Sequence, residues 1–267
     1  MTRTRVATAV LMVAVLAAVV FLLPPLALVV LVVAALLMGA WEWSAFLRLE
    51  APLPRVLYVI TLITGLLAAW LWTGSRDGLQ LMLALTALWW LVSAAGLWWG
   101  TPRFSRLHAV VAGGFALVPT GVALLRLRFE WHPGIGWFLF VLFLPFVADT
   151  VAYFAGRRFG SRRLAPAISP GKSVEGAVGG VLAAGVYGAL CAPWLGQPRG
   201  LFTVLCLVAA LFSVVGDLNE SRFKRLAELK DSGHLLPGHG GVLDRIDSVT
   251  AAAPILLGGL LLLESLA

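Results

Sequence analysis

Polar residues are concentrated in one segment of an otherwise apolar chain, from Ser221 to Asp247, with Asp217 just before it. Asp217, Ser221 and Lys224 are spaced i, i+4 and i+7. On a helix this spacing places a carboxylate, a hydroxyl and an ammonium group on one face. Such a face can bind a cation and a phosphate together.

A second group of polar residues lies at the other end of this segment. Asp244, Asp247 and Ser248 are spaced i, i+3 and i+4, and we expect them at the start of the next helix, where carboxylates are favoured. Between the two groups lies Pro237-Gly-His-Gly-Gly241, whose glycines permit a sharp reversal and close approach to a ligand. The segment should therefore fold back and set Asp217 opposite Asp244 and Asp247.

Facing carboxylates with space for phosphate oxygens indicate a Mg²⁺ site of the kind used in nucleotide chemistry. Asp217, Asp244 and Asp247 are the predicted ligands. The cations that would neutralise a triphosphate are Lys224, Arg225, Lys230 and Arg245. An ordinary solvated loop would explain these cations, but not the acids Asp217, Asp231, Asp244 and Asp247, because acidic residues contribute little to membrane sidedness. His239 suits a structural role in the turn as well as a catalytic one.

An earlier polar segment runs from Asp149 to Gly180. Asp149, Tyr153 and Gly156 should share a helix face. Gly171-Lys172-Ser173 resembles the end of a P-loop, but the first glycine of that motif would fall at Pro166, and we expect no strand before it.

The same stretch is better explained as a helix start, with Ser169 as the cap and Pro170 in the first turn. Lys172 and Ser173 would then flank an anion site. Glu175 is either catalytic or a charge that suits the first turn of the helix.

The elements that position these residues must lie in a membrane. The chain has 267 residues, 60% hydrophobic and only 12% charged, whereas a soluble domain carries about 25% charged residues. A net charge of +7 fits basic cytoplasmic loops, and no basic stretch is long enough to form a nucleic-acid-binding domain. Cys191 and Cys206 lie in apolar runs, as packing residues rather than as a disulfide.

Nine apolar stretches are long enough to cross a bilayer as helices. They lie at about 6–23, 26–47, 56–73, 79–99, 107–125, 134–156, 174–195, 200–219 and 248–265. Pro24 and Pro25 separate the first two. The first stretch is too long for a secretory signal and lacks a convincing cleavage site, so we interpret it as a helix.

The distribution of basic residues gives the orientation. With nine spans, the N-terminus and the connections after the even-numbered spans share one side. That side carries 16 of the 20 Lys and Arg: Arg3, Arg5, Arg48, Arg55, Arg103, Arg106, Arg157, Arg158, Arg162, Arg163, Lys172, Arg222, Lys224, Arg225, Lys230 and Arg245. The positive-inside rule places this side in the cytoplasm.

We therefore predict an all-α polytopic membrane protein with about nine transmembrane helices, a cytoplasmic N-terminus and an active site at the cytoplasmic membrane face. Residues 1–130 would form a scaffold of transmembrane helices and residues 131–267 the catalytic region. Glu42 in the second span is an exception within the scaffold, and a carboxylate there indicates either a function or a buried partner.

The polar segments resemble a known family. Residues 221–247 read Ser-x-apolar-Lys-Arg, four residues, Lys-Asp-x-small, two residues, apolar-Pro-x-His-Gly-Gly-apolar-x-Asp-Arg-apolar-Asp. Every fixed position of the phosphatidate cytidylyltransferase (CDP-diacylglycerol synthase) signature is filled. The Asp149-x-x-Ala-Tyr-x-x-Gly and Ser169-Pro-x-Lys-Ser-x-Glu-Gly segments are similar to the family too, so the specific resemblance covers about residues 145–250.

This resemblance implies that CTP and phosphatidic acid react to give CDP-diacylglycerol and pyrophosphate for phospholipid biosynthesis. It implies a multi-pass protein of a bacterial inner (plasma) membrane and a homodimer. Asp217 and Asp244 match metal ligands of the family, and Ser221, Lys224 and Asp247 match residues needed for activity. A monovalent cation such as K⁺ beside the Mg²⁺ is also compatible with the resemblance.

The chemistry assigns roles to the remaining residues. The phosphate of phosphatidic acid is already a nucleophile, so catalysis should come from in-line alignment and from stabilising the charge of the leaving pyrophosphate. Lys224 and Arg225 would stabilise the transition state, and Asp247 would be a further metal ligand. The predicted substrate-binding residues are Lys172, Ser173, Glu175, Arg222, Lys230, His239, Gly240, Gly241 and Arg245. Further candidate site residues are Asp149, Tyr153 and Asp231.

Three other functions could use polar residues on membrane helices. CDP-alcohol phosphotransferases also use Asp clusters on membrane helices, but their Asp-Gly-x-x-Ala-Arg pattern is absent from the sequence. A transporter would carry its polar residues near the middle of the membrane, whereas here they lie at helix ends on one side. A cytidylyltransferase for another lipid phosphate stays open, because an apolar chain-binding groove serves either lipid.

Overall fold

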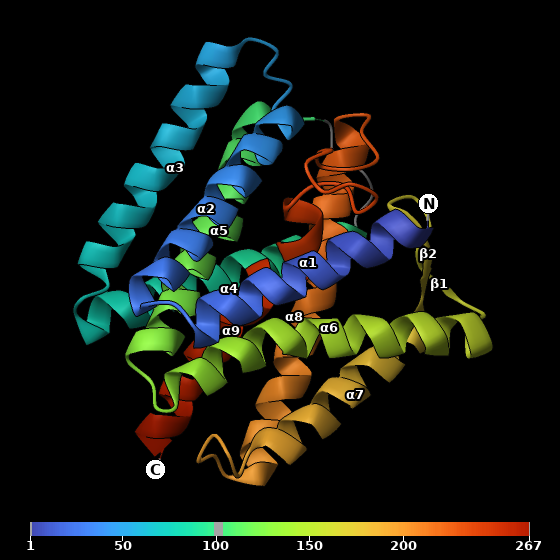
Figure 1. The fold of residues 1–267 in the computed structure, drawn as a ribbon. Coiled ribbons are helices and arrows are strands. Elements are labelled where there is room, and N and C mark those ends of the chain that lie inside the picture. The colour runs from blue at the N-terminus through green and yellow to red at the C-terminus, as the bar shows by residue number, and fades with distance from the viewer. Residues whose placement is uncertain (1, 99–103, 267) are drawn as a thin grey trace.

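A computed structural model describes residues 2–98 and 104–266 (Figure 1). Within these two ranges, nine α-helices and one short β-hairpin follow each other along the chain. The elements are α1 (Thr2–Phe21), α2 (Pro25–Phe46), α3 (Pro52–Trp72), α4 (Arg76–Trp98), α5 (Arg106–Phe129), α6 (Gly134–Phe159), β1 (Arg163–Ala165), β2 (Ser169–Ser173), α7 (Val174–Cys191), α8 (Arg199–Leu226) and α9 (Leu243–Leu266).

All nine of the helices that the structure describes are long and apolar enough to cross a membrane. The prediction of an all-α polytopic membrane protein is therefore confirmed. The predicted end of the fourth span, at residue 99, lies outside the described residues. Two bounds matter for the site: α8 continues to Leu226, and α9 begins at Leu243, five residues before its predicted start. Both polar groups of the later segment therefore lie on helices.

Proline marks several of the helix starts. Pro25 and Pro52 are the first residues of α2 and α3, and Pro198 caps α8. A proline in the first turn replaces an N–H group that would have no partner within the helix. The separation of α1 from α2 at Pro24 and Pro25 is confirmed.

Helix α9 lies at the centre of the bundle. It packs against α2, α4, α5, α6 and α8, and small residues at Ala251, Ala252 and Ala253 are fully buried. Small side chains let transmembrane helices approach closely. The helices of residues 1–130 and 131–267 thus share one interior, and their division into scaffold and catalytic regions stays a prediction.

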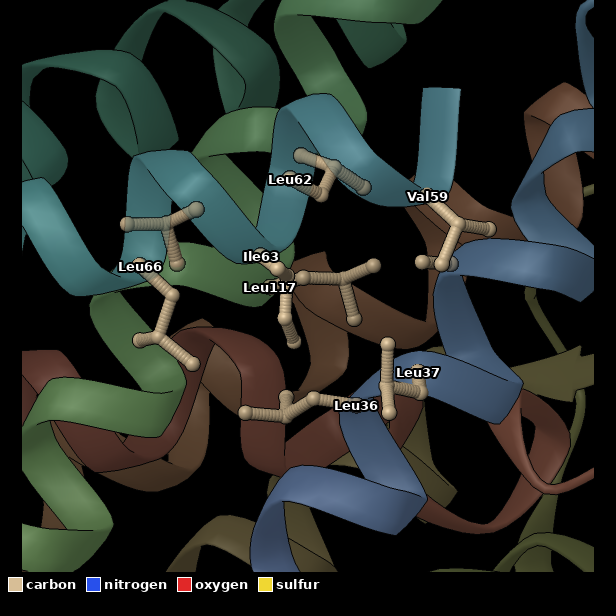
Figure 2. Close-up of a pocket in the computed structure, with 9 residues that line it drawn as sticks. Leu36, Leu37, Val59, Leu62, Ile63, Leu66 and Leu117 are labelled. Atoms are coloured by element: carbon tan, nitrogen blue, oxygen red, sulfur yellow. The ribbon is translucent and has the colours of Figure 1, made fainter. Parts of the chain in front are cut away.

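The N-terminal helices are held together by branched apolar side chains. Figure 2 shows leucine, valine and isoleucine side chains of α2, α3 and α5 pointing toward one another. The remaining space between them is about 10 Å³, near the smallest space that can hold one water molecule. This region is a packed interior, in keeping with a scaffold.

Glycines bring α7 close to α6. A Cβ atom at Gly180 would lie 2.5 Å from the carbonyl oxygen of Ala148, and one at Gly176 would lie 2.7 Å from that of Ala152. Only glycine permits this approach. The contact places the start of α7 beside the polar end of α6.

The start of α1, the connection after α2 and the segment between α8 and α9 lie at one end of the bundle (Figure 1). Arg48, after α2, donates to the carbonyl of Leu226 at the end of α8 over 2.7 Å. Thr8 of α1 donates to the carbonyl of Pro237 over 3.0 Å. These contacts agree with the predicted grouping of basic connections on one side, whereas Arg103 lies outside the described residues. The cytoplasmic orientation of this end stays a prediction.

Candidate active site

A cleft of about 770 Å³ opens at this end of the molecule. Its walls come from α6, the β1–β2 hairpin, α7, α8 and α9, so the two polar segments of the sequence meet in one place. The charged residues that line it are Asp149, Arg157, Arg163, Lys172, Asp217, Lys224, Asp231, Asp244, Arg245 and Asp247. The cleft is thus lined by five acidic and five basic side chains.

Lys172 and Asp217 join the two polar segments. The ammonium group of Lys172, on β2, forms an ion pair with the carboxylate of Asp217, on α8. The hydroxyl of Ser221, one turn further along α8, donates to the other carboxylate oxygen of Asp217 over 3.4 Å. The predicted helix face of Asp217, Ser221 and Lys224 is confirmed: Ser221 is hydrogen-bonded to Asp217, and Lys224 lines the cleft together with Asp217, although Ser221 itself is not part of the lining.

Asp244 is held from three directions. Its Oδ1 lies 2.8 Å from the Nζ of Lys224, and its Oδ2 accepts hydrogen bonds from the backbone N–H groups of Gly241 (2.8 Å) and Ser232 (3.1 Å). The Nζ of Lys224 also lies 3.2 Å from Glu220. Because the side chains of Asp244 and Glu220 are only 8% and 2% exposed, Lys224 neutralises charges that water cannot reach well.

Asp247 lies where negative charge accumulates. Its carboxylate is close enough to those of Asp217 and Glu220 for mutual repulsion, and it accepts a hydrogen bond of 2.7 Å from the backbone N–H of Ser248. The hydroxyl of Ser248 donates to Asp149, on α6, over 3.2 Å. Gathered carboxylates of this kind favour a bound cation.

The predicted reversal at Pro237-Gly-His-Gly-Gly241 is confirmed. Gly238 and Gly240 have φ angles of +77° and +83°, which L side chains rarely adopt. A Cβ atom at Gly240 would also lie 2.5 Å from the Oδ2 of Asp244. The backbone of the turn therefore lies in close contact with the carboxylate of Asp244.

This contact gives a testable prediction. Gly240→Ala should lower turnover about 100-fold, because the new methyl group displaces Asp244 and a shift of about 1 Å has that effect. Gly196→Ala is the matched control, since Gly196 also has a positive φ, of +66°, but a Cβ atom there meets open space and the residue does not line the cleft. Turnover measured on both purified variants decides the matter, and a Gly240→Ala protein as active as the control would refute the contact's importance.

The start of α7 differs from the prediction. Ser169 and Pro170 do not begin a helix: they lie in β2, which pairs antiparallel with β1, and Ser173 caps α7 by accepting from Gly176 N–H over 3.1 Å. Proline is tolerated because the hairpin has only two strands and each has a free edge. The sequence is still not a P-loop, because Pro166 occupies the position of the first glycine. The other argument against it was wrong, since the strand β1 does precede this segment.

Comparisons with known proteins identify the family of this chain. The model of the cytidylyltransferase family matches residues 3–262. A phosphatidate cytidylyltransferase of Haemophilus influenzae is 37% identical, over 95% of this chain and 96% of its own. The enzyme of that name from Pseudomonas aeruginosa is 39% identical, over 82% of each chain. The one from Brucella abortus is also 39% identical, over 71% of this chain and 72% of its own.

This chain belongs to the cytidylyltransferase family. The motifs that resembled the family in sequence therefore lie in a member of it, and most of them line the cleft. Of the predicted site residues, the cleft brings together Asp149, Tyr153, Lys172, Ser173, Asp217, Lys224, Asp231, Asp244, Arg245 and Asp247.

Other predicted site residues lie around the cleft rather than in its lining. Arg225 reaches from the end of α8 to the carbonyl of Ile168 over 3.3 Å and so holds the hairpin. Glu175 accepts hydrogen bonds from the hydroxyl and N–H of Ser161 and the N–H of Arg162, at the base of the hairpin. These contacts favour the structural interpretation of Glu175.

Arg222 does not line the cleft, although it was predicted to bind substrate. It is buried on the side of α8 that faces Gly96 of α4 and His108 of α5. Lys230 is exposed on the loop after α8, and His239 is half-buried between the two glycines of positive φ. Gly241 contacts Asp244 through its backbone, as described above.

Three residues of the site were missed by the sequence analysis or left without a role. Glu220 could have been recognised, because it lies four residues before Lys224 on a helix, a spacing that favours ion pairs. Ser232 and Glu42 could not be linked to Asp244 from the sequence, because their contacts join α2 to a loop about 190 residues later.

The donor set suits Mg²⁺ bound together with a nucleotide. Within residues 2–98 and 104–266, no three acidic, histidine or cysteine side chains form a ready-made metal cage. Magnesium in nucleotide enzymes is held by one or two carboxylates and by substrate phosphates, so such a cage is not required. Asp217 and Asp247 supply hard oxygen donors next to an open cleft, and Asp244 stands beside them on α9.

Proposed function

We propose that this protein transfers the cytidylyl group of CTP to phosphatidic acid, releasing pyrophosphate and forming CDP-diacylglycerol for phospholipid biosynthesis. One observation carries the proposal: both polar segments of a cytidylyltransferase-family chain meet in a single charged cleft at the end of its transmembrane bundle. The names of the relatives supply the lipid substrate.

The reaction requires alignment more than proton transfer. A phosphate oxygen of phosphatidic acid forms a bond to the α-phosphorus of CTP, and the bond from that phosphorus to the bridging oxygen of pyrophosphate breaks. Lys172, Arg245 and Arg163 line the cleft and would hold the phosphates in line. Lys224, fixed by two buried acids, would stabilise the transition-state charge.

Asp217, Asp244 and Asp247 would hold Mg²⁺, which when bound offsets the charge of the pyrophosphate leaving group. A second, monovalent cation such as K⁺ would suit the remaining carboxylate oxygens near Glu220. Lys172 pairs with Asp217 and so keeps the two polar segments together. Once Asp217 binds Mg²⁺, the charge of Lys172 would become available to the triphosphate.

The cleft suits one substrate from water and one from the bilayer. Besides its charged residues, it is lined by Ala152, Leu164, Ala177 and Val214, which belong to or adjoin membrane-spanning helices. A lipid phosphate can enter along these apolar residues while CTP arrives from solution. We place this end of the bundle at the cytoplasmic face of a bacterial inner (plasma) membrane and expect a homodimer.

The lipid substrate is tested by a panel of lipid phosphates. Purified protein with CTP and Mg²⁺ should convert phosphatidic acid to CDP-diacylglycerol, and a polyprenyl phosphate should react at least about 100 times more slowly. The product is followed by mass spectrometry. A preference for the polyprenyl phosphate would favour the second candidate, a cytidylyltransferase for another lipid phosphate.

The role of Lys172 gives a further prediction. Lys172→Met should lower kcat/KM for CTP about 30-fold, because it removes a charge-assisted contact to phosphate and leaves Asp217 without its cation. Arg158→Met is the control, since Arg158 is a neighbouring exposed cation that packs over Phe159 outside the cleft. Equal kinetics of the two variants would contradict the role of Lys172.

A further inference from the structure

Glu42 is a carboxylate on α2, far in sequence from every residue of the cleft and 7% exposed. Its Oε2 accepts a hydrogen bond of 2.7 Å from the backbone N–H of Leu243, the first residue of α9, and its Oε1 accepts one of 3.0 Å from Val242. The first N–H groups of a helix have no partner within it. Glu42 thus caps α9 from another helix, where a negative charge is favoured.

The same carboxylate also holds the loop before α9. The buried hydroxyl of Ser232 donates to the Oε2 of Glu42 over 3.1 Å. A Cβ atom at Gly233 would lie 2.5 Å from the Oε1 of Glu42, and one at Gly241 would overlap its Oε2. The backbone of the loop therefore encloses the carboxylate at both ends.

Ser232 connects this arrangement to the cleft. While its hydroxyl binds Glu42, its backbone N–H binds the Oδ2 of Asp244 over 3.1 Å, and Asp244 pairs with Lys224. A continuous chain of contacts thus runs from α2 through the loop to two residues of the proposed reaction. A shift of the Glu42 carboxylate would therefore disturb the contacts that hold Asp244, through Ser232 and through the start of α9.

We infer that Glu42 is a positioning residue of the active site: it fixes the loop of residues 232–241 and the start of α9 so that Asp244 and Asp247 stand in the cleft. The role assigned to those two acids rests on the proposed function. Glu42 itself lies outside the cleft lining and acts through Ser232, Val242 and Leu243. A carboxylate suits this position better than an amide, because all of its partners are donors.

The test compares Glu42→Ala and Glu42→Gln with Ser44→Ala. Ser44 is also buried on α2, two residues away, and its hydroxyl donates to the carbonyl of Trp41 within its own helix. Turnover per folded protein and hydrogen exchange of the backbone amides of residues 232–243 are measured on each.

Glu42→Ala should lower kcat about 100-fold, as displacement of catalytic groups by about 1 Å does, while KM for CTP changes less than kcat. Exchange of the Val242 and Leu243 amides should accelerate about tenfold or more. Glu42→Gln keeps the shape but presents an amide N–H to donors, so it should show the same two changes at a smaller size. Ser44→Ala should leave kcat and exchange at the wild-type values.

Two outcomes would overturn the inference. One is a folded Glu42→Gln or Glu42→Ala protein whose kcat stays within twofold of the wild type. The other is unchanged exchange of the loop amides. Should Glu42→Ala fail to fold, Glu42→Gln decides. Should the wild-type protein itself lack cytidylyl transfer, the proposed function fails, and the exchange measurement alone still decides whether Glu42 holds the loop.

Discussion

Asp244→Asn is expected to lower turnover by about 1000-fold, the upper end of what loss of a single preorganised group causes. The asparagine keeps the shape of the side chain but removes its charge. Lys224, whose side chain is 12% exposed, then keeps only Glu220 as a charged partner. The amide N–H group of the asparagine would face either Lys224 or both backbone donors, Gly241 and Ser232, because these two share one oxygen of Asp244.

The measurement is the initial rate of CDP-diacylglycerol formation from CTP and phosphatidic acid. Glu228→Gln is the matched control, because Glu228 is an acid near the end of α8 whose side chain is 86% exposed and pairs with Arg48 outside the cleft. The control should retain the wild-type rate. A rate for Asp244→Asn above about one tenth of that value would contradict the assignment of Asp244 to the reaction.

Asp247→Asn is expected to change activity and stability in opposite directions. Turnover should fall about 100-fold, because a carboxylate proposed to hold Mg²⁺ is lost. The free energy of unfolding should rise by about 1 kcal/mol, because Asp217 and Glu220 no longer face a like charge. The hydrogen bond from Ser248 N–H to Oδ1 is preserved, since asparagine keeps that acceptor.

Two measurements check this prediction: the rate of product formation, and thermal unfolding in detergent with and without Mg²⁺. Mg²⁺ alone should stabilise the wild-type protein and should stabilise Asp247→Asn less, because a cation that binds only the folded state adds stability. A variant that is both inactive and less stable than the wild type would show that Asp247 is chiefly a structural residue.

Much of the fold follows from the sequence because the bilayer requires it. Backbone groups in hydrocarbon must be paired within a helix, so apolar length alone predicts the helices. The glycine turn was also predictable, because the positive φ angles of Gly238 and Gly240 favour that residue type. These features can be predicted because they depend on the properties of neighbouring residues in the sequence and not on distant contacts.

The parts that could not be predicted depend on contacts between distant segments. The β1–β2 hairpin has strands of three and five residues, too short for a sequence signal, and is held by Arg225 from α8 and by Glu175. Asp217 and Lys172 are 45 residues apart. Charge sidedness predicts that they share one face of the membrane, but not that they pair.

Helical geometry explains the position of Arg222, which the sequence analysis placed among the phosphate-binding residues. Successive residues of a helix point about 100° apart. Arg222 follows directly after Ser221, so it cannot share the face that carries Asp217, Ser221 and Lys224. The basic character of the segment suggested a phosphate contact, whereas the helix directs this side chain into the bundle.

The most direct test of cytidylyl transfer in this cleft is the simultaneous measurement of pyrophosphate and of cytidylylated lipid, with purified wild-type protein, CTP, Mg²⁺ and phosphatidic acid. We expect the two products to form in equal amounts, neither to form without phosphatidic acid, and Asp244→Asn to reduce both together. Pyrophosphate release without a lipid product, or undiminished transfer by Asp244→Asn, would contradict the proposed reaction.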